Sequence, residues 1–317
     1  MSVLDLNDVD TLVLCGGGVH GIAYLGALET LHLKHGLEVF PLGPRNPRVT
    51  TICGVSVGAL IGLLIALGFD TYAETHALMN TILRSLLEDV HLVSFARDWG
   101  GNNGEGIRSL LRARAAKRIG LSRPTFAQLH EKTGVRLRVS ATDLCTCSTV
   151  CFSPDKTPDT DVVDAVYGSM AVPPLFAPSR TNDSRLLVDG GLIRNVPRLP
   201  PGTPPERVLV LRAVEDGSNN PVVEPVNRVQ DYISRIVRCA FLARVRDDLG
   251  WLEERGLAGQ TISMDCNGIS SAFSFGLNDR TKKSLLLVGL EAAEAFLKTK
   301  DEVVPCSRSR SIATQTD

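Results

Sequence analysis

The chain has 317 residues, of which 44% are hydrophobic and 22% charged, and its formal net charge is −1. This composition is typical of a folded globular protein that is large enough to bury a sizeable core. Because there is no excess of basic residues to suggest nucleic-acid binding, we expect no nucleic-acid partner, and we expect any attraction to a lipid surface to be hydrophobic and local.

Residues 1–10 contain three aspartates and no basic residue, so we expect a short N-terminal extension and no signal peptide. The interpretation that follows is a cytoplasmic protein, peripheral on membranes where it meets lipid. Its eight cysteines are then expected to be reduced thiols.

A glycine-rich turn is predicted between a buried strand at 11–15 and an apolar helix at 21–34. Successive backbone amides in such a turn can point at one oxygen, as an oxyanion hole requires. The predicted oxyanion loop consists of Gly16, Gly17, Gly18 and Val19, supported by His20 and Gly21.

The same glycines also match the G-x-G-x-x-G fingerprint of dinucleotide-binding proteins. That fingerprint needs an acidic residue at the end of a second strand, about 20 residues further on. Glu38 is the nearest candidate, but it precedes the apolar residues of its segment and prolines follow it. The fit to a nucleotide site is therefore poor.

A serine lies on a second sharp turn, in the sequence Gly-Val-Ser-Val-Gly between a strand predicted at 49–53 and a helix at 57–68. Gly54 and Gly58 remove side chains that would collide in such a turn. The hydroxyl of Ser56 then projects at a helix N-terminus, where developing negative charge is favoured. We therefore predict that Ser56 is a nucleophile.

Residues 52–69 carry no charge and are long enough to raise the question of a membrane-spanning helix. The stretch contains several glycines and the predicted nucleophile, which favours a strand, turn and helix in a protein core. We expect no transmembrane segment.

The base that would activate Ser56 is predicted to be a carboxylate. The chain has six histidines and none beyond His130, so the order Ser, Asp, His of an α/β-hydrolase triad is absent. Asp189 follows a strand predicted at 185–188 and enters a turn through Gly190 and Gly191. A carboxylate is a weak base at its ordinary pKa of about 3.9, but burial can raise that pKa.

Further strands are predicted at 135–141, 149–152 and 207–212, and further helices at 70–90, 105–118, 226–256 and 281–299. Strands that alternate with helices favour an α/β fold with a mostly parallel central sheet covered by helices on both faces. The predicted divisions are the extension at 1–10, a catalytic domain at 11–215, a helical region at 216–300 packed on it, and a disordered tail at 301–317.

The helix at 226–256 is expected to pack through its apolar residues and to leave its arginines in solvent. The residues expected to face inward are Val229, Ile233, Ile236, Val237, Ala240, Phe241 and Val245. The residues expected in solvent are Arg235, Arg238, Arg244 and Arg246.

Three clustered cysteines, Cys145, Cys147 and Cys151, lack paired C-x-x-C spacing and a neighbouring histidine. We expect neither a metal site nor a cofactor.

Taken together, the motifs resemble those of the patatin-like phospholipases over roughly residues 11–215. The family pattern has a Gly-Gly-Gly-x-Arg/Lys-Gly loop, a Gly-x-Ser-x-Gly elbow and an Asp-Gly-Gly/Ala turn. Similar segments stand here at Gly16–Gly21, Gly54–Gly58 and Asp189–Gly191, and two further blocks, at 141–144 and 168–178, also look similar.

The resemblance implies a three-layer patatin-like fold and a catalytic Ser56–Asp189 dyad that acts through an acyl-enzyme without metal. It implies a lipid substrate, reached by transient contact with a membrane or lipid surface. The family has Arg or Lys where this chain has His20, which is cationic only near or below its ordinary pKa of about 6.5. Preference for charged phospholipids therefore stays open.

The leading hypothesis is a lipid acyl hydrolase of the phospholipase A or lysophospholipase type. A neutral-lipid or small-ester hydrolase is one alternative, kept open by His20. A non-catalytic lipid-binding protein on the same scaffold is another.

Overall fold

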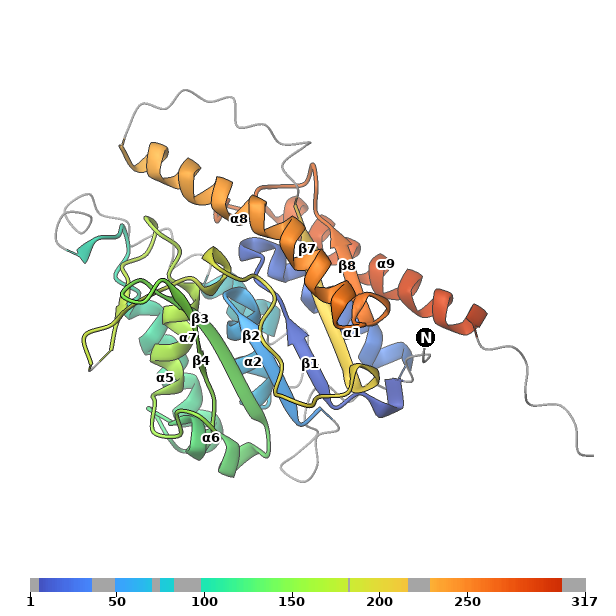
Figure 1. Ribbon diagram of the computed structural model, residues 1–317, viewed down its shortest axis with the longest axis horizontal. Helices are drawn as coiled ribbons and strands as arrows, with labels where there is room; N and C mark the ends of the chain where they lie inside the picture. Colours follow the sequence, from blue (N-terminus) through green and yellow to red (C-terminus); the bar gives the residue numbers. More distant parts are fainter. Residues whose placement is uncertain are drawn as a thin grey trace, which may run out of the picture.

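The computed structural model describes residues 6–35, 49–69, 75–82, 98–181, 183–215 and 229–303. Within these residues, an eight-stranded sheet forms the centre of the molecule (Figure 1). The strands are β1 (Thr11–Leu14), β2 (Thr51–Val55), β3 (Arg136–Asp143), β4 (Ser148–Phe152), β5 (Ser179–Arg180), β6 (Leu186–Val188), β7 (Val208–Val214) and β8 (Thr261–Asp265).

The strand order is β5-β6-β3-β2-β1-β7-β8, and β4 also pairs with β3. The neighbours from β3 to β8 in this order are parallel, whereas β4, β5 and β6 join by antiparallel pairing. All residues of β1 and β2 are buried. Because alternate residues of a strand face opposite sides, both faces of the central strands are covered.

The helices that flank the sheet are α1 (Gly21–His35), α2 (Val57–Ala66), α5 (Glu105–Ile119), α6 (Phe126–Thr133), α7 (Val162–Met170), α8 (Val229–Glu254) and α9 (Asp279–Val303). Helix α2 packs on β1, β2 and β3 and contacts α7, whereas α9 packs along α1. A side chain at Gly289 would collide with the backbone of Ala23, so glycine lets these two helices approach closely. The predicted α/β fold with a central sheet between helices is confirmed.

Each predicted strand is present with bounds shifted by one or two residues, but β5, β8, α6 and α7 were not predicted. Strand β8 pairs with β7, so the sheet includes residues after 215. Of the helix predicted at 70–90, only residues 75–82 lie within the described part, and these are helical. Of the tail predicted at 301–317, only residues 301–303 lie within the described part, and they form the end of α9.

The prediction for the two faces of α8 was wrong at three positions, two on the inward face and one on the solvent face. Val229 and Ile236 are 69% and 51% exposed. Arg238, which was expected in solvent, is instead largely buried and pairs with Glu215 at 2.9 Å. The physical reason is that α8 has apolar residues on two sides, so spacing alone does not tell which side packs. The side chains of Val245 and Arg246 lie outside the described part.

Among the described helices, none combines the length and the apolar character needed to cross a bilayer. The described residues also contain no group of three or more His, Cys, Asp or Glu side chains arranged to hold a metal ion. Cys145 and Cys147 lie in the turn after β3 and Cys151 lies on β4, all as free thiols.

Candidate active site

The strand-to-helix turn at Ser56 is a strained elbow at the carboxyl end of β2. Ser56 has φ 53° and ψ −127°, a backbone conformation that residues with a side chain rarely adopt. A Cβ atom on Gly54 would lie 2.6 Å from Cα of Ala59, and one on Gly58 would collide with the carbonyl of Leu14. Both glycines are therefore required for α2 to begin directly after the serine.

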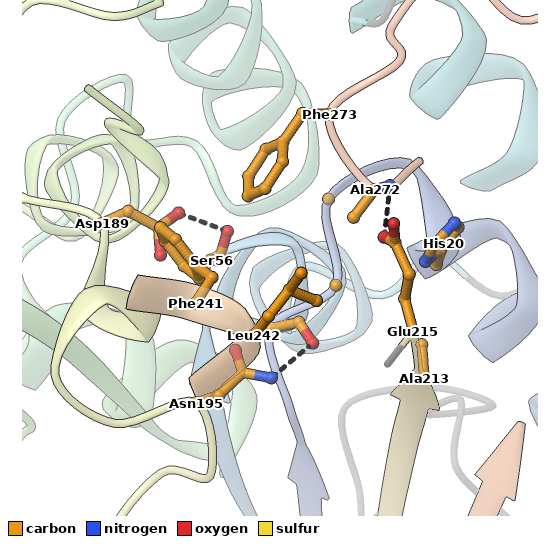
Figure 2. A pocket seen from close by; sticks show the side chains of 13 residues that line it. His20, Ser56, Asp189, Asn195, Ala213, Glu215, Phe241, Leu242, Ala272 and Phe273 are labelled. Atoms are coloured by element: carbon orange, nitrogen blue, oxygen red, sulfur yellow. Dashed lines mark hydrogen bonds between the residues drawn. The ribbon is translucent and has the colours of Figure 1, made fainter. Parts of the chain in front are cut away.

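The hydroxyl of Ser56 donates a 2.5 Å hydrogen bond to Oδ2 of Asp189 (Figure 2). Asp189 is fully buried, and its Oδ1 accepts a 2.8 Å bond from the amide of Gly191. Burial raises the pKa of Asp189 to about 7, although the bonds from Ser56 and Gly191 act in the opposite direction. The structure thus brings together the two residues that the sequence predicted as a dyad.

The backbone of Ser56 is held by a polar chain that the sequence analysis did not identify. The amide of Ser56 donates to Oγ of Ser169 at 2.9 Å, and that hydroxyl donates to the carbonyl of Ser140 at 2.6 Å. All three groups are buried. The chain links the elbow to α7 and β3. The only sequence signal was the place of Ser169 in the block at 168–178.

The glycine loop after β1 lies against the elbow. Asn195 binds the loop twice: its side chain donates to the carbonyl of Gly16, and its own carbonyl accepts from the amide of Gly16, both at 3.1 Å. The amide of Val19 donates to the carbonyl of Ala272 at 2.9 Å. Among the described residues, no group accepts a hydrogen bond from the amides of Gly17 or Gly18, and both residues line the cavity at Ser56.

His20 is buried beside this loop, and its Nε2 lies 2.9 Å from the carbonyl of Ser270. Burial lowers the pKa of His20, although the Ser270 carbonyl and the charge of Glu215 oppose the shift. The lowered pKa favours the neutral imidazole at neutral pH, in the tautomer whose Nε2 donates to the Ser270 carbonyl.

The Ser56 cavity is roofed by residues far along the chain. We use "cover" for α8 together with residues 266–278. Helix α8 contributes Phe241 and Leu242 to the cavity lining, and the segment 266–278 contributes Ala272 and Phe273. Figure 2 shows Phe241, Leu242 and Phe273 around the Ser56 hydroxyl. The cavity has an empty volume of about 520 Å³, open space included. Sequence reasoning assigned no functional role to any of these cover residues.

Glu215, directly after β7, joins the two segments of the cover. One carboxylate oxygen accepts a 2.8 Å bond from the amide of Ala272, and the other pairs with Arg238 of α8 at 2.9 Å. The side chain of Glu215 is only 7% exposed, so solvent screens this pair weakly. Glu215 therefore fixes both cover segments at the edge of the glycine loop.

A family model described as patatin-like phospholipase matches residues 12–201. The chain is 28% identical over 189 residues to the probable lipid hydrolase 463L of Invertebrate iridescent virus 6. This match covers 59% of this chain and 61% of that protein. It is 32% identical over 209 residues to YqhO of Bacillus subtilis strain 168, and this match covers 58% of this chain and 64% of YqhO. The matches thus span about three fifths of the length of these relatives.

Among solved structures, the chain is similar to VipD from Legionella pneumophila. The TM-score is 0.62 at 16% sequence identity, and the match covers 92% of this chain and 67% of VipD. At that identity the similarity shows the fold alone.

Proposed function

The chain belongs to the patatin-like phospholipase family, and on that premise we propose that it is a lipid acyl hydrolase of the phospholipase A or lysophospholipase type. The observation that carries the proposal is the 2.5 Å hydrogen bond between Ser56 and Asp189. A nucleophile on a strained elbow, in direct contact with a base, forms the central unit of acyl transfer.

In the proposed reaction, Oγ of Ser56 attacks the ester carbonyl of the lipid while Asp189 accepts the hydroxyl proton. The ester C–O bond then breaks, Asp189 returns the proton to the leaving alcohol, and the acyl group stays on Ser56. Water attacks the carbonyl carbon of this acyl-enzyme while Asp189 accepts a proton from it. The bond between that carbon and Oγ of Ser56 then breaks, Asp189 returns the proton to Oγ, and the fatty acid leaves. A pKa of about 7 suits Asp189 to accept and return protons near neutral pH.

The developing oxyanion is assigned to the amides of Gly17 and Gly18. These two line the cavity, whereas the amides of Gly16 and Val19 already donate to protein carbonyls. Preorganised backbone donors of this kind stabilise negative charge without having to reorient during the reaction. The proposed steps use only groups of this chain and call for no metal or cofactor.

A neutral-lipid or small-ester substrate is the second candidate. Burial lowers the pKa of His20 beside the glycine loop, which disfavours a cation there, and the lining of the Ser56 cavity includes the carboxylate of Glu215. An anionic headgroup placed in this cavity would meet no unpaired cation among its lining residues, because these include neither Lys nor Arg. The ester that reaches Ser56 therefore either is uncharged or keeps its headgroup outside the cavity.

The test is release of fatty acid by wild type and by Ser56→Ala, with chelator present. Vesicles of phosphatidylcholine, lysophosphatidylcholine micelles and triacylglycerol emulsions would be compared. Ser109→Ala, at an exposed serine on α5, is the matched control. Release by wild type and Ser109→Ala alone is expected, and the best substrate decides between the two candidates. Binding of lipid by wild type without any product would instead support a non-catalytic lipid-binding protein.

A further inference from the structure

Helix α8 presents apolar side chains to solvent on the side opposite to the active site. Val229, Tyr232 and Ile236 are 69%, 59% and 51% exposed. At about 3.6 residues per turn these positions share one face of the helix, and the exposed residues Cys239 and Ala243 continue it. We use "outer stripe" for Val229, Tyr232, Ile236, Cys239 and Ala243.

The opposite face of the same helix reaches the catalytic cavity. Phe241 and Leu242 line the cavity at Ser56. A second cavity, with an empty volume of about 830 Å³, open space included, lies between α8 and the Val172–Leu175 segment, and Phe273 lines both cavities. The outer stripe is therefore separated from the route to Ser56 by about one helix diameter, roughly 10–12 Å.

The stripe lies on the basic part of α8. Residues 229–246 contain four arginines and one aspartate, whereas residues 247–254 contain four acidic residues and no basic one. By helical spacing Arg235 and Arg244 stand on the two flanks of the stripe, and Arg244, 47% exposed, pairs with Asp247. Arg238 pairs with Glu215 on the opposite face, so the positive charge beside the stripe is that of Arg235 and Arg244, and this charge is complementary to an anionic surface.

Figure 1 shows the first turns of α8 extending past the neighbouring strands and helices in that view. An aromatic residue with a hydroxyl, such as Tyr232, suits a boundary between apolar and aqueous phases. An amphipathic helix with arginines beside an apolar stripe can lie in the plane of a bilayer interface.

We propose that the outer stripe of α8 is the docking surface for a lipid bilayer that contains anionic lipids, and that docking there presents lipid to the cavity at Ser56. The second part rests on the proposed function, but the first does not, because adsorption to a bilayer needs no catalysis. Docking buries the three large side chains of the stripe and brings the flanking arginines to the anionic headgroups.

The test uses the full chain with Ser56→Ala, so that vesicles stay intact during binding. The stripe variant adds Val229→Ser, Tyr232→Ser and Ile236→Ser. The matched control adds Leu33→Ser and Leu287→Ser, at leucines that are 71% and 55% exposed on α1 and α9. Sedimentation with vesicles of phosphatidylcholine, with and without phosphatidylserine, measures partitioning.

We expect the parent and the control to bind the mixed vesicles more tightly than phosphatidylcholine alone. The stripe variant is expected to lose at least about tenfold in partitioning, since it no longer buries three large apolar side chains. Equal binding by the stripe variant and the parent would overturn the proposal. A self-associated parent that the stripe variant converts to monomer, with vesicle binding unchanged, would assign the stripe to a second copy of the chain instead.

A parallel assay keeps the two proposals separable. With Ser56 intact, the stripe variant should hydrolyse a soluble short-chain ester as fast as wild type, while hydrolysis of lipid in mixed vesicles falls by about the same factor as binding. Absence of soluble-ester hydrolysis in wild type would refute the proposed function but leave the vesicle-binding result standing. Equal loss on both substrates would overturn the assignment of the stripe to docking.

Discussion

The elbow at Ser56 and the cover above it meet in one cavity but are built in different ways. The elbow is formed by neighbours in sequence, with glycines at fixed positions and every residue of α2 buried. The cover is held by contacts between distant segments, such as that between His20 and Ser270, which are 250 positions apart. The comparison indicates that the chemistry is encoded locally, whereas access to it is encoded by tertiary contacts.

Asp189→Asn gives the largest expected effect and tests the elbow directly. Loss of the base should lower kcat by about 10²–10⁴-fold, the range for a single general base. The fold should be retained, because asparagine has the size of the aspartate and still offers an acceptor to Ser56. The measurement is ester turnover beside a thermal unfolding curve. A turnover close to that of wild type would place the base elsewhere.

The pH dependence of wild type tests the same residue without a substitution. Since Asp189 has to be ionised to accept a proton and its pKa is about 7, kcat/KM should rise with pH and level off above that value. Below it, the rate should fall by about tenfold per pH unit. A rate that is flat from pH 5 to 8 would contradict the assignment.

Stability should change with pH in the opposite direction. The pKa of Asp189 rises from 3.8 to about 7 on folding, so its ionisation destabilises the folded state as pH rises from about 4 to about 7. Asp189→Asn lacks this ionisation. The free energy of unfolding of the variant minus that of wild type should therefore be larger at pH 8 than at pH 5. Denaturant unfolding of both proteins at the two pH values measures this difference.

Glu215→Gln tests the cover in the same way that Asp189→Asn tests the elbow. The substitution removes the buried negative charge that pairs with Arg238, which should lower the free energy of unfolding by on the order of 3 kcal/mol. Amide hydrogen exchange should quicken in α8 and in residues 266–278, while the backbone around Ser56 stays protected. Arg244→Gln, which removes an exposed pair with Asp247, is the control and should cost less than about 1 kcal/mol. Equal exchange in both regions would show that elbow and cover unfold as one unit.

The sequence was sufficient for the elbow and the strands around it because their signals are short and local. Gly54 and Gly58 flank Ser56, β-branched residues precede it, and Asp189 is followed by glycine. Helix α7 also had a local signal that was not used: the side chain of Asp161 accepts from the amides of Val163 and Asp164 as an N-cap.

The orientation of the cover could not be predicted from local sequence signals. On α8, Val229 faces solvent although it is apolar, and Arg238 is largely buried although it is charged. That orientation depends on Glu215, which lies outside the helix, and on the 266–278 segment that closes over the same carboxylate. No spacing within residues 226–256 carries this information.

Ser169→Ala makes a smaller change within the elbow. It leaves the amide of Ser56 and the carbonyl of Ser140 without their shared hydroxyl, at a cost of about 1–3 kcal/mol in stability. We expect kcat to fall while KM changes little, because the substitution shifts the nucleophile rather than the lipid-binding surface. Ser169→Cys and Ser169→Thr would show whether another side-chain donor restores the rate. Unchanged kcat in Ser169→Ala would exclude a positioning role.

The smallest expected effect concerns the contact between the two parts of the cover. The rings of Phe241 and Phe273 meet edge to face with centroids 5.3 Å apart, a geometry worth about 0.5–1.5 kcal/mol beyond burial. A double-mutant cycle with Phe241→Ala and Phe273→Ala, measured by unfolding, should give a coupling energy in that range. Phe126 and Phe152, stacked in the core at 6.4 Å, give the reference cycle. Additive effects at Phe241 and Phe273 would mean that the contact between the two rings does not help to hold α8 against residues 266–278, which would leave the Glu215 contacts as the stronger link.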